Sequence, residues 1–136
     1  MAQPKTSLRF TPGLSMAKGP RPDEFKGKEL NERKIILKDS KLLTEAGVFS
    51  IVLECVESSL SKEISKTINI PTIGIGAGKY CDGQVLVMHD MLGINTEFKP
   101  RFLRKYLNIH EQATDAIKSY INDVKNNDFP NESESY

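Results

Sequence analysis

The chain has 136 residues, which is enough for one domain but too few for a closed (β/α)8 barrel of about 250 residues. Hydrophobic residues make up 38% and charged residues 27%, a composition that favours a folded domain over a disordered chain. The 19 Lys and Arg and 18 Asp and Glu leave a net charge of +1, so no global field indicates nucleic acid or an anionic membrane as a partner.

Residues 1–28 carry six basic and two acidic side chains and are interrupted by Pro and Gly, which predicts an irregular basic arm. Acid-poor basic segments also occur in organelle transit peptides, so a mitochondrial location is an alternative to the cytoplasm. Cys55 and Cys81 match neither a disulfide framework nor a zinc motif, which indicates a reducing compartment. No apolar run is long enough to predict a membrane span.

The rest of the chain alternates helical periodicity with short apolar runs. Gly47 follows the first helical stretch and is a typical helix stop. The predicted elements in chain order are a helix at 29–46, a strand at 48–53, a helix capped by Ser58 or Ser59 and running to 68, strands at 72–75 and 84–88, a helix at 100–126 and a frayed tail at 128–136. This order is an α/β pattern with parallel strand pairing.

A three-stranded parallel sheet is small and leaves two edges with unpaired backbone groups, so the pattern resembles part of a larger sheet. The predicted organisation is an arm at 1–28, a partial α/β domain at 29–127 and a flexible tail at 128–136.

Reactive groups of parallel α/β proteins lie at the carboxyl ends of the strands. Glu54 directly follows an apolar strand, and partial desolvation destabilises a carboxylate and suits it to accept a proton. The alternative is that Glu54 only marks the point where the strand reaches solvent.

The other strand ends carry a glycine-rich loop, Gly74–Gly78, and the pair His89 and Asp90. The loop fails the dinucleotide fingerprint because Lys79 stands where the third glycine belongs, but it could cradle a phosphate or carboxylate or simply allow close backbone packing. His89 and Asp90 are adjacent and would point to opposite faces of a strand, so they are a poor pair of metal ligands.

Three segments together resemble one family: EAGVFSIVLECV at 45–56, IPTIGIGAG at 70–78 and CDGQVLVMHDMLG at 81–93. They are similar to the C-terminal part of the ketopantoate hydroxymethyltransferase (3-methyl-2-oxobutanoate hydroxymethyltransferase) family of pantothenate biosynthesis. The resemblance extends over about residues 29–136. It implies a (β/α)8 TIM barrel of which this chain supplies the last three strands and their helices.

The resemblance implies an enzyme that transfers a hydroxymethyl group from 5,10-methylenetetrahydrofolate to 3-methyl-2-oxobutanoate with Mg²⁺. It assigns the proton-accepting carboxylate to Glu54. The family's magnesium and keto-acid ligands lie mainly on earlier strands, so no residue of this chain inherits a metal-binding role, and we expect a truncated chain that is inactive alone. Glu57 stands where the family usually has a proline.

The implied partners are the keto acid, the folate and further protein subunits, because the family forms large homo-oligomers. The alternative function is a non-catalytic remnant or regulatory partner that associates with a full-length homologue. A third hypothesis is an independent phosphate or nucleotide binder that uses the loop Gly74–Gly78.

Overall fold

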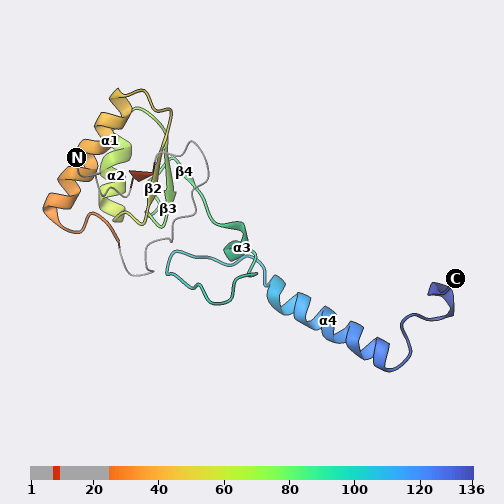
Figure 1. Ribbon diagram of the computed structural model, residues 1–136. Helices are drawn as coiled ribbons and strands as arrows, with labels where there is room; N and C mark the ends of the chain where they lie inside the picture. Colours follow the sequence, from red (N-terminus) through yellow and green to blue (C-terminus); the bar gives the residue numbers. More distant parts are fainter. Residues whose placement is uncertain (1–7, 10–24) are drawn as a thin grey trace, which may run out of the picture. The chain divides into compact units, whose positions relative to one another are not determined.

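The computed structural model describes residues 8–9 and 25–136 (Figure 1). Its elements in chain order are β1 (Leu8–Arg9), α1 (Leu30–Glu45), β2 (Ile51–Glu54), α2 (Ser58–Thr67), β3 (Thr72–Ile75), β4 (Gly83–Gln84), α3 (Met88–Met91), α4 (Ile109–Lys125) and the 3₁₀ turn η1 (Glu132–Glu134). They form two units. The first contains the described residues up to Leu86 together with Pro100–Leu103, and the second contains Val87–Lys99 and Arg104–Tyr136.

The first unit is built on a sheet with the strand order β1-β2-β3-β4. β2 pairs with β3, and β3 with β4, in parallel, which confirms the predicted α/β class and strand direction. β1 pairs antiparallel with β2, with Leu8 opposite Leu53. The prediction of an irregular arm is therefore wrong at residues 8–9, because the exposed edge of β2 can pair with any extended segment that reaches it. The remainder of the arm, including the transit-peptide alternative, lies outside the described residues.

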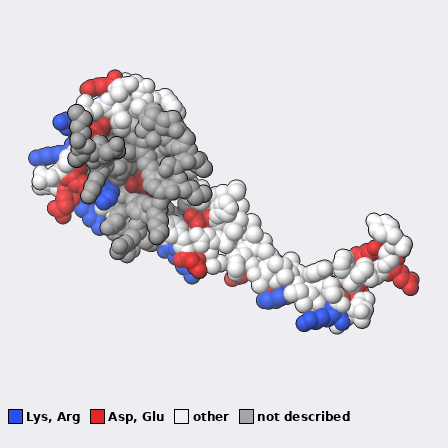
Figure 2. Space-filling view, in the orientation of Figure 1, with Lys and Arg blue, Asp and Glu red and all other residues white. Residues whose placement is uncertain are grey.

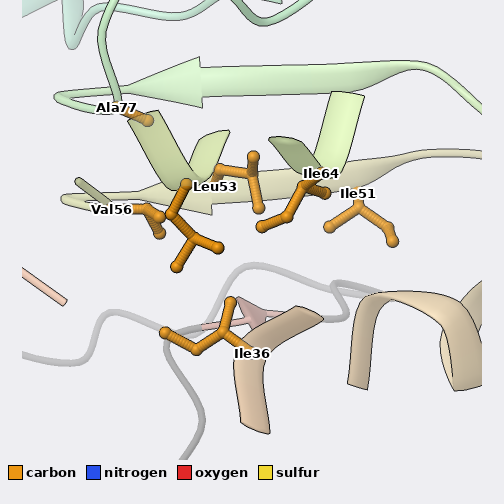
Figure 3. Packing of buried hydrophobic residues seen from close by; sticks show 7 residues of the cluster. Ile36, Ile51, Leu53, Val56, Ile64 and Ala77 are labelled. Carbon is orange, nitrogen blue, oxygen red and sulfur yellow. The ribbon is translucent and has the colours of Figure 1, made fainter. Parts of the chain in front are cut away.

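One face of the sheet is covered by both helices of the first unit. Ile51 and Leu53 are buried on this face, whereas Val52 and Glu54 alternate with them and are partly exposed. A single apolar cluster joins them to α1 and α2 (Figure 3); its buried members are Ile36, Ile51, Leu53, Val56, Leu60, Ile64 and Ala77. The sheet thus has a helix-covered face and an opposite face that carries Glu54.

In the first unit, several observed elements match those predicted from the sequence. α1 ends before Gly47, whose φ of 85° is favourable for glycine, and β3 matches the predicted strand at 72–75. The predicted strand at 48–53 begins later, at Ile51. The helix predicted after Ser58 or Ser59 is α2, but its N-cap is Glu57 rather than either serine, because the longer carboxylate reaches two free amides of the first turn.

The predicted strand at 84–88 is wrong. β4 contains only Gly83–Gln84, Val85 and Val87 are about half exposed, and Met88–Met91 form the short helix α3. β4 pairs with β3 over two residues and has no second neighbour among the described strands. Long parallel strands are usually buried on both faces. Residues 85–87, which would continue β4, are not buried in this way.

The helix predicted at 100–126 begins only at Ile109, as α4. The backbone amide of Tyr106 donates to the carbonyl of Met91 at 2.8 Å, and that of Ile109 donates to Leu92 at 3.0 Å. These bonds tie residues before α4 to the α3 segment. They take the place of the i to i−4 bonds that would continue the helix toward Pro100.

The second unit contains α3, α4 and η1. α4 has no buried residue. The division between the units falls inside residues 29–127, the segment that the sequence analysis treats as one partial barrel domain, and the boundaries at 28 and 127 stay predictions. Within the described residues, no helix has both the length and the apolar character of a bilayer-crossing segment.

Candidate functional site around Glu54

Glu54 is the last residue of β2 and lies opposite Ile75, the last residue of β3. Both strands therefore end together at the carboxyl edge of the sheet. Glu54 is partly buried and shares the face that the helices leave uncovered with Val52 and Ile73. A partly buried carboxylate beside apolar side chains at a strand end is a setting in which an acidic group can act as a base.

The turn that follows Glu54 has an unusual backbone conformation. Cys55 has φ 50°, in the left-handed region that non-glycine residues rarely adopt. Its amide donates to the carbonyl of Ile75 at 2.8 Å, and its own carbonyl accepts from the amide of Lys26 at 2.8 Å. The amide of Glu57 donates to the carbonyl of Lys26, also at 2.8 Å. Backbone bonds on both sides therefore hold the turn.

Glu57 links this turn to both helices. Its Oε2 accepts from the amides of Ser59 at 2.9 Å and Leu60 at 3.1 Å, from the Ser59 hydroxyl, and from Arg33 Nη1 at 3.0 Å. The hydrogen bond from the Ser59 hydroxyl is the main cause that lowers the pKa of Glu57 to about 2, and the two amides and Arg33 act in the same direction. Glu57 is thus a charged helix cap that also joins α1 to α2.

A second polar network fixes the β3–β4 connection. Asp82 Oδ2 accepts from the amide and the hydroxyl of Thr72, each at 2.8 Å, and the Thr72 hydroxyl oxygen lies 2.7 Å from Ser65 Oγ. Since the single Thr72 hydroxyl proton goes to the carboxylate, Ser65 must be the donor to Thr72. The bond from the Thr72 amide is the main cause that lowers the pKa of Asp82. These hydrogen bonds hold Asp82, in the connection between β3 and β4, against the first residue of β3.

The glycine loop approaches protein side chains closely. A Cβ at Gly76 would lie 2.8 Å from the Phe102 ring, and one at Gly78 would lie 2.2 Å from Ser58 Oγ. Both residues have positive φ. Of the two explanations left open by the sequence, these contacts support close packing and give no support to a phosphate cradle.

His89 and Asp90 do not end a strand. They lie on α3 in the second unit, with His89 exposed and Asp90 buried, where Asp90 Oδ1 accepts from Asn95 Nδ2 at 3.2 Å. Glu54 and the loop Gly74–Gly78 belong to the first unit. The structure therefore gives the histidine no strand-end position of the kind that the sequence analysis expected.

The two cysteines are free, and their thiols are poorly suited to be nucleophiles. Burial raises the pKa of Cys55, and the neighbouring charge of Glu54 adds to that effect. Burial also raises the pKa of Cys81, against the lowering effect of its hydrogen bonds with Thr72 and Ser65. Less thiolate is present at neutral pH as a result.

Acidic and metal-binding side chains of the described residues do not gather into a metal site. No group of three or more His, Cys, Asp or Glu side chains in the described ranges could hold a metal ion. Acidic and basic side chains are interspersed on the face shown in Figure 2, in agreement with the net charge of +1. The described residues thus do not fit a magnesium ion.

Sequence reasoning identified Glu54 but missed Arg33 and Glu57 as residues that hold the turn after it, and Asp82 as a residue that fixes the start of β3. Glu57 was open to detection, since an acidic residue directly before a Ser-Ser helix start is a capping signal. The partnership with Arg33, 24 positions away, had no local signal.

The fold and site define a class: an α/β protein with a small parallel sheet and a partly buried carboxylate at the carboxyl end of a strand. The family model described as ketopantoate hydroxymethyltransferase matches residues 12–132, and the chain belongs to this family.

A 3-methyl-2-oxobutanoate hydroxymethyltransferase of Pelagibacter ubique is 60% identical over 113 residues, which are 83% of this chain and 44% of the relative. The enzyme of that name from Chlorobium phaeobacteroides is 50% identical over 113 residues, covering 83% of this chain and 41% of the relative. That of Kosmotoga olearia is 55% identical over 104 residues, covering 76% and 39%. The chain spans less than half the length of these relatives.

Proposed function

We propose that this chain supplies the C-terminal part of a 3-methyl-2-oxobutanoate hydroxymethyltransferase, with Glu54 as its general base. The observation that carries the proposal is the position of Glu54: at the carboxyl end of a parallel strand, on the sheet face opposite α1 and α2. Membership of the hydroxymethyltransferase family gives that carboxylate a substrate class.

The two faces of the sheet also support a partial (β/α)8 barrel. In such barrels the helices lie outside and the opposite face of each strand points inward. α1 and α2 both pack on the face of Ile51 and Leu53, so Val52, Ile73 and Glu54 lie on the face that would point inward. The proposed barrel needs strands beyond those described here, and we propose that the 136-residue chain by itself is a very poor catalyst.

The proposed step is a proton transfer. The Glu54 carboxylate takes the proton from C3 of 3-methyl-2-oxobutanoate, and the electron pair of the broken C–H bond forms the enolate, whose charge rests on the C2 oxygen. C3 then forms a bond to the methylene carbon that 5,10-methylenetetrahydrofolate delivers. Both C–N bonds of that carbon break, water supplies the oxygen of the new hydroxyl group, and N5 and N10 of the departing tetrahydrofolate take the second proton of that water and the proton held by Glu54. Because the described residues do not fit the implied Mg²⁺, no step is assigned to a metal here.

The test is exchange of the C3 proton of 3-methyl-2-oxobutanoate in D₂O, which isolates deprotonation from the folate step. The chain would be measured by itself and joined to the N-terminal part of the Pelagibacter ubique relative. We expect exchange only in the joined protein, and Glu54→Gln should lower its rate by about 10²–10⁴. Glu45→Gln, which changes an exposed carboxylate at the end of α1, is the matched control. Equal exchange rates in Glu54→Gln and wild type would show that another group is the base.

The alternative function, a non-catalytic or regulatory partner of a full-length homologue, has one supporting observation. β4 has a single neighbour, β3, among the described strands, and an open edge can accept a strand from another subunit. Adding the chain to a full-length homologue and measuring C3 exchange separates the two: a catalytic segment adds activity when joined, whereas a regulatory one changes the activity of the homologue through association.

A further inference from the structure

Among the described residues of the first unit, the one non-glycine residue with a positive φ lies directly beside Glu54. Left-handed backbone at a non-glycine residue is unfavourable and persists only where surrounding contacts hold it. Cys55, with φ 50°, is such a residue, and its conformation sets the direction in which the chain leaves Glu54. The groups that hold this turn therefore also set where the Glu54 carboxylate can point.

The backbone bonds of the turn depend on Lys26 and its neighbour. Lys26 forms a parallel bridge with Val56, between the carbonyl of Cys55 and the amide of Glu57. The next residue, Gly27, is hydrogen-bonded to two side chains at the start of α1. Its amide donates to Glu32 Oε2 at 2.7 Å, and its carbonyl accepts from Arg33 Nη1 at 3.4 Å. One side of the turn is thus attached to α1.

Arg33 also holds the other side of the turn. Its Nη1 donates to Glu57 Oε2 and to Ser59 Oγ, each at 3.0 Å, and its Nη2 donates to Glu63 Oε2 at 3.2 Å. The guanidinium of Arg33 thus donates hydrogen bonds to Gly27, which follows the strand partner of Val56, and to Glu57, which follows Val56 in the chain. A planar group with five donors is suited to such a junction, whereas the ammonium of a lysine is not.

We propose that Arg33 and Glu57 are positioning residues that hold the strained turn at Cys55 and thereby orient the Glu54 carboxylate for proton transfer. This inference rests on the proposed function, because the orientation matters only if Glu54 is the base. Arg33 and Glu57 do not take part in the chemistry themselves.

The test uses four variants of the full chain. Arg33→Met removes the junction, Arg33→Lys keeps its charge, and Glu57→Asp keeps a helix-capping carboxylate but shortens its reach toward Arg33. Lys118→Met, which breaks the exposed Lys118–Asp115 pair of α4, is the matched control. The readouts are amide hydrogen exchange and the ¹³C chemical shift of the Glu54 carboxyl carbon at pH 7, measured by NMR.

We expect Arg33→Met to accelerate exchange at the amides of Cys55 and Glu57 by about tenfold while the interior of α2 stays protected, since a charge-assisted contact to the turn is lost. The carboxyl ¹³C chemical shift of Glu54 at pH 7 should change in Arg33→Met, change less in Arg33→Lys and stay the same in Lys118→Met. If Arg33→Met does not fold, Glu57→Asp decides by the same two readouts. Equal acceleration of exchange at all amides of the first unit, or an unchanged Glu54 carboxyl shift, overturns the proposal.

In the joined enzyme, Arg33→Met and Glu57→Asp should lower kcat for C3-proton exchange and leave KM for the keto acid near the wild-type value, whereas Lys118→Met should change neither. An equal fall in kcat and rise in KM would contradict a positioning role. If the joined wild-type protein shows no C3-proton exchange, the proposed function fails. Amide exchange and the Glu54 carboxyl chemical shift then still decide whether Arg33 and Glu57 control the turn.

Discussion

The two units of this chain differ in how they bury their apolar residues. In the first, Leu53, Leu60 and Ile64 are fully buried in one cluster between the sheet and two helices. In the second, all of whose residues are described, only Asp90 and Gly93 are buried. The comparison teaches that a regular apolar pattern is not itself a core, because α4 has the periodicity of a packed helix and no buried side chain.

The largest expected effect concerns the whole chain. The second unit exposes a row of apolar side chains on α4, among them Ile117, Tyr120, Ile121 and Val124. We expect the 136-residue chain to self-associate rather than to behave as a well-folded monomer, because exposed apolar patches of this kind drive association. Sedimentation and thermal unfolding measure this. A monomeric mass together with one sharp cooperative transition would contradict it.

The contrast between the units can be measured with one substitution made in each. Ile64 is fully buried in α2, and Ile117 is 58% exposed in α4. Ile64→Ala should lower the free energy of unfolding by about 2–5 kcal/mol, because it leaves a cavity in the core. Ile117→Ala should change it by less than about 0.5 kcal/mol.

Urea unfolding would be followed at a concentration where sedimentation shows a single species. Similar losses for the two variants would mean that α4 is as tightly packed as α2, and the contrast between the units would fail.

Packing inside the first unit can be tested at two glycines with positive φ. A Cβ at Gly76 would meet the Phe102 ring, whereas nothing lies within 4 Å of one at Gly47. Gly47→Ala should cost about 1–2 kcal/mol from backbone strain alone, and Gly76→Ala roughly 2–4 kcal/mol because overpacking is added. Thermal unfolding of the pair gives the difference, and equal costs would show that the contact with Phe102 is easily relieved.

The smallest predicted effect is the pH dependence that Glu57 gives to the first unit. Its pKa is about 2 in the folded chain against 4.5 in the unfolded chain, so its stabilisation is present above about pH 4.5 and is lost as the pH falls toward 2. Asp82, whose pKa is also lowered, acts in the same direction. Because the Glu57 side chain is 35% exposed, solvent screening reduces its contribution to about 1 kcal/mol.

Urea unfolding at pH 7 and at pH 3 measures how much the free energy of unfolding falls with pH, and Glu57→Gln should make that fall smaller. If the free energy of unfolding falls as much in Glu57→Gln as in the wild type, other carboxylates cause the loss of stability at low pH.

Sequence patterns located the parts of the fold that depend on neighbours along the chain. The helix predicted at 29–46 and the strand at 72–75 correspond to α1 and β3, since helix stops and strand periodicity are local signals. Glu54 could be placed at a strand end for the same reason. The pairing of β1, the short helix α3 and the late start of α4 depend on backbone partners distant in sequence, which periodicity does not report.

What the sequence by itself determined is the α/β class, the family and the position of one carboxylate behind an apolar strand. Only the tertiary structure decided that Arg33 and Glu57 meet across 24 positions, that Cys55 adopts a left-handed conformation between them and Glu54, and that the glycine loop packs on Ser58 and Phe102. The physical reason is that apolar periodicity is a property of consecutive residues. Hydrogen-bond partners and backbone strain are properties of elements brought together by packing.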